Sequence, residues 1–168
     1  PEALYTPDWE EIPDSVLSPK LYLETVQTRT DDLRCLNEAK RNAETFLPLR
    51  CDRLLAIAEI VGWLFGDGHL EIHYRPSRQN PAYNVQFFGS EKELTEVSQR
   101  MTWLGLPTSG IIHAQATSEL PSGHVIQGHT CRIQQQTIPV FTLFELLGVP
   151  VGDKARVEYR LPEWIKSG

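Results

Sequence analysis

Apolar positions in the first third of the chain recur at the spacing of amphipathic helices. From Asp31, which we expect to be an N-cap, they recur every three or four residues as far as Leu47, and this predicts a helix that ends at Pro48. A second helix is predicted from about Asp52 to Asp67, where apolar residues occur on nearly every side, so this helix must be buried. The first 19 residues contain four prolines separated by acidic residues, which indicates an extended arm.

After residue 68 the apolar positions alternate with polar ones, as in a half-buried antiparallel sheet. Strands are predicted over about 69–75, 83–88, 112–117 and 129–136. Helices are predicted over about 90–104, where Ser90 and Glu93 form a capping box, and over about 137–147. From Asp52 onward, the order helix, two strands, helix, two strands, helix predicts an α+β domain with one four-stranded sheet.

One face of the predicted sheet carries amide, His and Arg side chains and few Lys or Glu. Arg and amide side chains read base edges in a major groove, so this face fits a nucleic-acid reader. It also fits an ordinary solvated face that is rich in glutamine, and alternation alone does not separate the two. The candidate nucleic-acid contacts in and beside the strands are His69, His73, Arg75, Arg78, Asn84, Gln86, His113, Gln115, Thr130, Arg132, Gln134 and Gln136.

The buried helix ends in the sequence Ile60-Val-Gly-Trp-Leu-Phe-Gly-Asp-Gly68. Gly62 and Gly66 share one helix face, where their missing side chains would let a second helix approach closely. Asp67 follows at the C-terminal end, where the helix dipole disfavours a carboxylate, so a hard divalent cation such as Mg²⁺ would compensate. Alternatively, the glycines serve tight packing within the domain and Asp67 is a turn residue. Gly68 is expected to be a left-handed cap.

The stretch AEIVGWLFGDGHL resembles the LAGLIDADG homing-endonuclease family, in particular the endonuclease domains found inside inteins. The resemblance covers roughly residues 52–168, including segments 144–149 and 160–165, and leaves 1–51 as an N-terminal arm and helical extension. It implies an αββαββα half-domain whose saddle-shaped sheet lies in the major groove of double-stranded DNA. Because one motif copy is visible, it implies a homodimer or a missing second half.

The resemblance also implies a site-specific, metal-dependent DNA endonuclease. Asp67, with the Gly66 carbonyl nearby, would hold Mg²⁺ or another hard divalent cation. Lys154 or Arg160 would replace the lysine that such proteins usually carry before a hydrophobic–Pro pair. The alternative is a cleavage-deficient DNA- or RNA-binding module of the maturase or transcription-regulator type. A third reading is a protein-interaction domain that dimerises through the glycine-containing helix.

Composition limits these readings. Hydrophobic residues make up 40% of the 168 residues and charged residues 23%, which is typical of a globular domain. The net charge of −6 argues against a strong, non-specific polyanion binder. The cysteines, Cys35, Cys51 and Cys131, match no zinc pattern and predict reduced thiols in an intracellular, cytoplasmic protein. Each of the five histidines is expected to be a hydrogen-bonding residue, and neither a membrane span nor a signal peptide is expected.

The chain begins with Pro1 and ends with Gly168. We expect it to be a fragment or an excised domain of something longer. The splicing residues that a self-splicing intein module would need are absent from this sequence, so in an intein the chain would be the endonuclease part alone.

Overall fold

The computed structural model describes residues 17–45, 47, 51–74, 76, 80–119, 121–156 and 158–166. Residues 1–16 of the arm predicted over residues 1–19 therefore lie outside the described residues, whereas Ser18 and Pro19 are the N-cap and the first residue of α1. The described elements are α1 (Pro19–Arg29), α2 (Leu33–Thr45), α3 (Cys51–Phe65), β1 (Gly68–His73), β2 (Ala82–Gly89), α4 (Glu91–Trp103), β3 (Ile112–Glu119), β4 (Val125–Gln135), α5 (Ile138–Leu146) and α6 (Glu163–Lys166).

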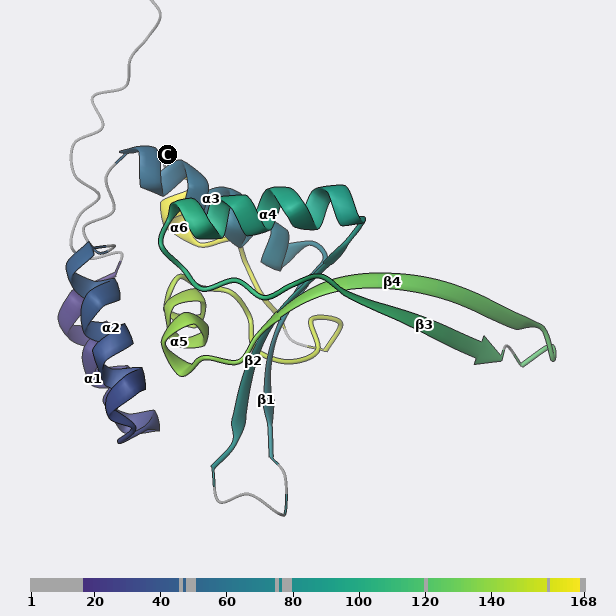
Figure 1. Cartoon of the computed structure of the whole chain (residues 1–168), viewed down its shortest axis with the longest axis horizontal. Helices are drawn as coiled ribbons and strands as arrows, with labels where there is room; N and C mark the ends of the chain where they lie inside the picture. Colours follow the sequence, from purple (N-terminus) through teal and green to yellow (C-terminus); the bar gives the residue numbers. More distant parts are fainter. Residues whose placement is uncertain are drawn as a thin grey trace, which may run out of the picture.

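The four strands form one open antiparallel sheet in the order β1-β2-β4-β3. The β1–β2 hairpin and the β3–β4 hairpin extend away from the helices in different directions (Figure 1). The predicted α+β class and the four-stranded antiparallel sheet are confirmed. The more specific LAGLIDADG half-domain architecture is not confirmed.

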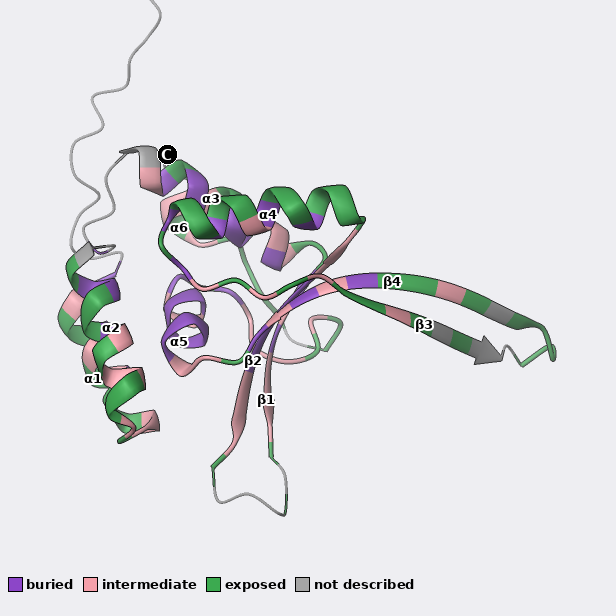
Figure 2. Cartoon of the chain, in the orientation of Figure 1, coloured by how far each residue is buried: buried purple, intermediate pink, exposed green. Residues whose placement is uncertain are grey.

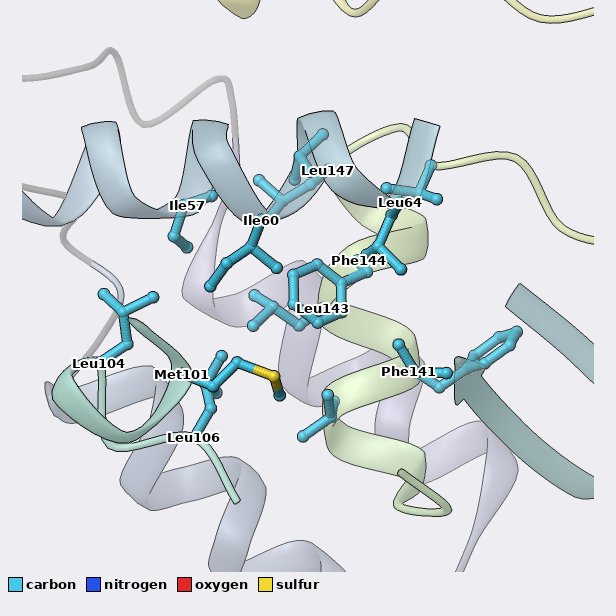
Figure 3. Close-up of a cluster of buried hydrophobic side chains, with 14 of the residues drawn as sticks. Ile57, Ile60, Leu64, Met101, Leu104, Leu106, Phe141, Leu143, Phe144 and Leu147 are labelled. Atoms are coloured by element: carbon cyan, nitrogen blue, oxygen red, sulfur yellow. The ribbon is translucent and has the colours of Figure 1, made fainter. Parts of the chain in front are cut away.

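Helix α5 lies at the centre of the hydrophobic core. It begins at the N-cap Thr137, whose hydroxyl accepts a hydrogen bond from Val140 N at 3.4 Å, and every residue from Pro139 to Phe144 is buried. Helices α1 and α2 pack on it, as does β2, and Figure 2 shows it buried along most of its length. Figure 3 shows side chains of α3, of α4 with the loop after it, and of α5 gathered in one cluster: Ile57, Ile60, Leu64, Met101, Leu104, Leu106, Phe141, Leu143, Phe144 and Leu147.

Helix α1 was not predicted from the sequence. Its buried residues are Tyr22 and Val26, and two apolar positions are too few to establish a helical period. The Tyr22 hydroxyl donates a hydrogen bond to the Pro139 carbonyl at 3.2 Å and accepts one from Asn42 Nδ2 at 3.3 Å. Burial raises the pKa of Tyr22 to about 12, so the hydroxyl keeps its proton and its role as a donor. The predicted division into an N-terminal extension (residues 1–51) and a separate domain (residues 52–168) stays a prediction.

Arg29 provides a second link between α1 and α5. Its guanidinium donates a hydrogen bond to Thr142 Oγ1 at 2.9 Å and forms an ion pair with Glu145. The same group lies 5.4 Å from the ring centroid of Tyr83 and 5.6 Å from that of Phe141. Because its side chain is only 17% exposed, the charge is largely removed from water and depends on these partners.

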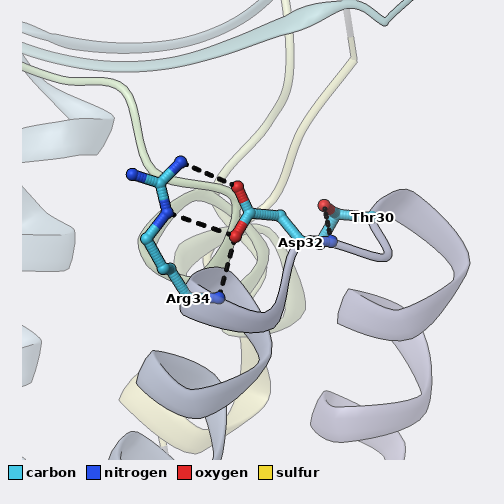
Figure 4. Close-up of polar contacts among 3 residues, drawn as sticks. All are labelled: Thr30, Asp32 and Arg34. Carbon is cyan, nitrogen blue, oxygen red and sulfur yellow. Dashed lines mark hydrogen bonds and ion pairs between the residues drawn. The ribbon is translucent and has the colours of Figure 1, made fainter.

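The turn between α1 and α2 shows why α2 begins later than predicted. Asp32, and not Asp31, caps the helix: its carboxylate accepts hydrogen bonds from the backbone N–H of Arg34 at 2.8 Å and from the Arg34 guanidinium at 3.1 and 3.4 Å (Figure 4). The Asp32 N–H donates to Thr30 Oγ1 at 3.1 Å. Hydrogen bonds from Arg34 lower the pKa of Asp32.

Several predicted helix ends are confirmed. Ser90 and Glu93 form the capping box at the start of α4. Gly105 and Gly148 follow α4 and α5 with φ of +78° and +96°, a conformation that favours glycine. In the part of the chain that the structure describes, none of the helices is both long and apolar enough to cross a membrane.

Gly68 differs from its predicted role. It does not have a positive φ and is the buried first residue of β1. A side chain at this position would place its Cβ 2.5 Å from Leu64 Cα. Glycine is therefore needed here because β1 passes close to the backbone of α3, and not to form a left-handed cap.

The Arg29 contacts generate a test of how the amino-terminal helices are held. We expect Arg29→Ala to lower the free energy of unfolding by about 2–3 kcal/mol, because Glu145 loses its ion-pair partner in a largely buried position. Urea unfolding followed by circular dichroism measures the change. Lys20→Ala on the same helix is the control, because its side chain is 84% exposed and should contribute less than about 0.5 kcal/mol. Equal unfolding midpoints for the two variants would contradict the role of Arg29.

Candidate functional site

A lysine caps the end of α3, next to the Gly-Asp-Gly sequence. Lys154 Nζ donates hydrogen bonds to the backbone carbonyls of Leu64 at 3.2 Å, Phe65 at 3.0 Å and Gly66 at 2.6 Å. The last carbonyls of a helix have no partner within the helix, and a cation at that end interacts favourably with the helix dipole. Lys154 therefore stabilises the end of a helix that lies about 90 residues earlier in the chain.

The segment after α5 brings Lys154 to α3 by running beside β1. Val151 forms a parallel bridge with Leu70, and Gly152 N donates a hydrogen bond to the Leu70 carbonyl at 2.7 Å. Burial lowers the pKa of Lys154, and the negative charge of Asp67 acts in the opposite direction. The structure thus brings together three of the predicted site residues, Gly66, Asp67 and Lys154.

Gly66, Asp67 and Arg160 differ in their surroundings. The Gly66 carbonyl, predicted to bind metal, accepts the shortest of the Lys154 hydrogen bonds. Asp67 is exposed, and the one group of three or more potential metal ligands found among the described residues does not include it. Arg160 is exposed and pairs with Glu158 at 3.6 Å. The Mg²⁺ site and the catalytic roles of Asp67, Lys154 and Arg160 stay predictions.

The glycine face of α3 is open at Gly62. A side chain at Gly62 would find no atom within 4 Å of its Cβ in the described part of the chain, whereas one at Gly66 would contact the carbonyls of its own helix. Leu55, seven residues before Gly62 and hence on the same face, is 58% exposed. Tight packing within the domain, the alternative explanation for the two glycines, therefore does not account for Gly62.

The outer face of β1, β2 and β4 carries many of the predicted nucleic-acid contacts. Asn84 Oδ1 accepts a hydrogen bond from Gln134 Nε2 at 3.1 Å, and the Glu71 carboxylate lies 2.6 Å from His73 Nε2 and 3.5 Å from His69 Nε2. Asn84 is buried, so its amide is less accessible to a partner than predicted. The predicted contact of this face with double-stranded DNA is not tested by the structure. The predicted residues that the register places here are His69, His73, Asn84, Gln86, Thr130, Arg132 and Gln134.

Two residues predicted for this outer face, His113 and Gln115, lie on the other face of the sheet. The register pairs His113 with Cys131 and Gln115 with His129, and directly paired residues of antiparallel strands share a face. Strand β3 alternates as predicted, but the prediction placed the wrong set of alternate residues on the outer face, because the expected pairing with β4 was shifted by one residue. Of the remaining candidates, Gln136 is exposed just after β4, and positions 75 and 78 lie outside the described residues.

On that other face, His113, His129 and Cys131 come together. Cys131 Sγ lies 3.4 Å from His113 Nδ1 and 3.8 Å from His129 Nδ1, and the potential ligand atoms of the three residues all lie within 4.8 Å of one another. The two histidines are exposed and Cys131 is buried. This group could hold a metal ion. Sequence reasoning missed it because cross-strand pairing, and not spacing along the chain, brings the three residues together.

Comparison with known proteins finds relatives that are much longer than this chain. Neither a family model nor a solved structure matches it. The tRNA-splicing ligase RtcB of Pyrococcus abyssi is 35% identical in an alignment of 123 residues that covers 71% of this chain and 12% of that protein. The replication factor C small subunit of Methanocaldococcus jannaschii is 28% identical in an alignment of 111 residues that covers 66% of this chain and 6% of that protein. The DNA-directed RNA polymerase subunit Rpo1N of the same organism is 26% identical in an alignment of 138 residues that covers 80% of this chain and 10% of that protein. Three further relatives, 27–29% identical, are also named tRNA-splicing ligase RtcB.

These names contradict several predictions made from the sequence. The relatives are named a ligase, a replication factor and a polymerase subunit, so the prediction of a LAGLIDADG homing endonuclease of the intein type is corrected. The same names contradict the predicted DNA endonuclease activity and its alternative, a cleavage-deficient DNA- or RNA-binding module. In the structure, two residues of the motif have packing and capping roles: Gly68 lies close to the backbone of Leu64, and the Gly66 carbonyl accepts a hydrogen bond from Lys154. The coarser prediction of an enzyme agrees with the ligase names.

The Lys154 contacts give a test of this region. We expect Lys154→Met to lower the free energy of unfolding by about 1–2 kcal/mol, because three carbonyls at the end of α3 lose their donor. Urea unfolding measures the effect. Lys92→Met, at an exposed position of α4, should change stability by less than about 0.5 kcal/mol. The cap would be disproved by a Lys154→Met protein as stable as the Lys92→Met control.

Proposed function

We propose that this chain is a module carried within larger proteins of nucleic-acid metabolism, with a function separate from the reactions that name those proteins. The proposal rests on the similarity of one stretch to proteins of three different names, each of which it matches over only 6–12% of the relative's length. The three alignments cover 66–80% of this chain, so any two of them overlap. A ligase, a replication factor and a polymerase subunit do not share a reaction, and the shared stretch is not expected to perform all three.

The packing of the chain supports this proposal. Helices α1 to α5 and the sheet contribute side chains to one hydrophobic cluster, which includes fully buried aromatic residues such as Tyr22, Phe87 and Phe144. A domain with its own core can fold independently of the chain that carries it. Such independence is a condition for one module to occur in proteins of unrelated function.

A second candidate function is a contribution to RNA ligation. The ligase name that four of the relatives share favours it. The same similarity to a replication factor and to a polymerase subunit makes it the weaker of the two candidates.

Removal of the matching stretch from a relative separates the two candidates. The 123 residues of the Pyrococcus abyssi protein that match this chain would be replaced by a short Gly-Ser linker. We expect the shortened protein still to join RNA ends, because the activity in its name would lie in the other 88% of its length. The 168-residue chain alone, given the same RNA ends, should join none.

The control is a deletion of equal length elsewhere in the same relative, which should abolish joining. The proposal would be overturned if the isolated chain joined RNA ends. It would also be overturned if the shortened relative lost joining while its circular dichroism spectrum and melting temperature stayed unchanged. Either result would favour the second candidate.

We also propose that a second copy of the chain packs on the open face of α3. Gly62 offers close backbone approach there, and Leu55 supplies exposed apolar surface on the same face. Burial of this apolar surface is the driving force for association. This proposal is independent of the reaction that the module performs.

Substitution of Gly62 tests the association. We expect Gly62→Leu to shift the protein from dimer to monomer in sedimentation velocity experiments, because the added side chain would hold the two helices apart. The folded monomer accommodates the substitution, since nothing in the described residues lies within 4 Å of the new Cβ. Gly62→Ala, which stays small, should remain largely dimeric. A wild-type protein that sediments as a monomer at high concentration would contradict the proposal.

A further inference from the structure

We infer that His113, His129 and Cys131 form a zinc-binding site at the base of the β3–β4 hairpin, with three protein ligands and a fourth position open to solvent. This inference rests on the geometry of the hairpin and does not depend on the proposed function.

The sheet register sets the three ligands on one face. His113 on β3 lies directly opposite Cys131 on β4. His129 precedes Cys131 by two residues on the same strand, and residues two apart on a strand project from the same side. The arrangement therefore comes from backbone pairing.

The two sulfur–nitrogen distances match edges of a tetrahedral zinc site. With Zn–S of about 2.3 Å and Zn–N of about 2.0–2.1 Å, tetrahedral angles place sulfur and nitrogen about 3.5 Å apart. The two observed separations between Cys131 Sγ and the histidine Nδ1 atoms are 3.4 and 3.8 Å. The rings of His113 and His129 lie side by side, with centroids 5.4 Å apart and planes at 36°. A single ion can therefore reach all three donors with small side-chain adjustments.

The donor set selects the kind of ion. A thiolate and two imidazoles suit zinc and disfavour Mg²⁺, which prefers oxygen ligands. A hydrogen bond between the Cys131 thiol and His113 Nδ1 would also explain their 3.4 Å separation, but it would involve only one of the two histidines. Convergence of both Nδ1 atoms on one sulfur is the feature that favours an ion.

The position of the group suggests what the ion does. Cys131 is paired on one side with His113 and on the other with Gly89, the last residue of β2. Beyond this point, the described partner of β4 from Val125 to Thr130 is β3. A two-stranded ribbon is marginally stable in water, so an ion that joins β3 to β4 at this junction would stabilise the extension.

The exposure of the ligands leaves room for a fourth one. His113 and His129 are both exposed, while Cys131 is buried. An ion bound here would contact solvent on the histidine side and would keep an exchangeable water. Three protein ligands plus water is the arrangement of zinc sites that do chemistry, whereas structural sites have four protein ligands.

The test uses the 168-residue chain, reduced, stripped of metal and without an affinity tag. Zinc chloride would be titrated by calorimetry, and we expect one equivalent to bind. At a hundredfold excess of Zn²⁺ over Kd, the melting temperature should rise by about 5–10 °C. Co²⁺ in place of Zn²⁺ should give the charge-transfer absorption of a cobalt–thiolate bond.

Matched variants identify the ligands. His113→Gln, His129→Gln and Cys131→Ser should each lose stoichiometric zinc binding and the rise in melting temperature, and Cys131→Ser should also lose the cobalt–thiolate absorption. The controls are His124→Gln, in the exposed turn of the same hairpin, and Cys35→Ser on α2, both of which should bind zinc like the wild type. His113→Gln keeps the test decisive if Cys131→Ser unfolds, because His113 is exposed. Absence of one-to-one zinc binding in the wild type, or its retention in His113→Gln and His129→Gln, would overturn the inference.

Discussion

The burial of α5 is the constraint on which the rest of the structure depends. A helix that is apolar on nearly every side cannot remain at the surface, so other elements must cover most of it. The sheet and α3 supply part of that cover, and α1 and α2 supply more. Helix α1 also makes polar contacts with α5. Tyr22 donates a hydrogen bond to the Pro139 carbonyl, and Arg29 donates one to Thr142 and forms an ion pair with Glu145. The N-terminal helices are therefore held by specific partners as well as by apolar contact.

Much of the fold could be predicted from hydrophobic periodicity, and the failures have identifiable causes. The strands, the buried α3 and α5, and the capping box of α4 follow from strong local patterns. Helix α1 does not, because it buries only two residues and is held by packing on α2 and on α5, which lies more than 100 residues away. The phase of β3 was wrong because its one large apolar residue, Ile112, lies exposed on the outer face, and the other residues are small or polar and carry little information about the register.

The candidate sites were harder to predict than the fold, since they depend on pairing between distant residues. Lys154 was proposed from its place in a resemblance, and its observed role is to bind the carbonyls at the end of α3. The His113, His129 and Cys131 group has no spacing signal along the chain and becomes visible only with the register of β3 against β4. The Gly-Asp-Gly string gave the most specific prediction of a reaction, and the names of the relatives contradict it.

The link between Arg29 and Glu145 has a consequence for synthesis. A ribosome that adds about 5–20 residues per second needs roughly 6–23 s to make the chain between them, and α1 must wait for that time before its partners exist. During this interval Tyr22 and Val26 have no α5 to cover them, so α1 is accessible to chaperones and prone to aggregation. Helix α1 thus reaches its final position only after α5 has been made.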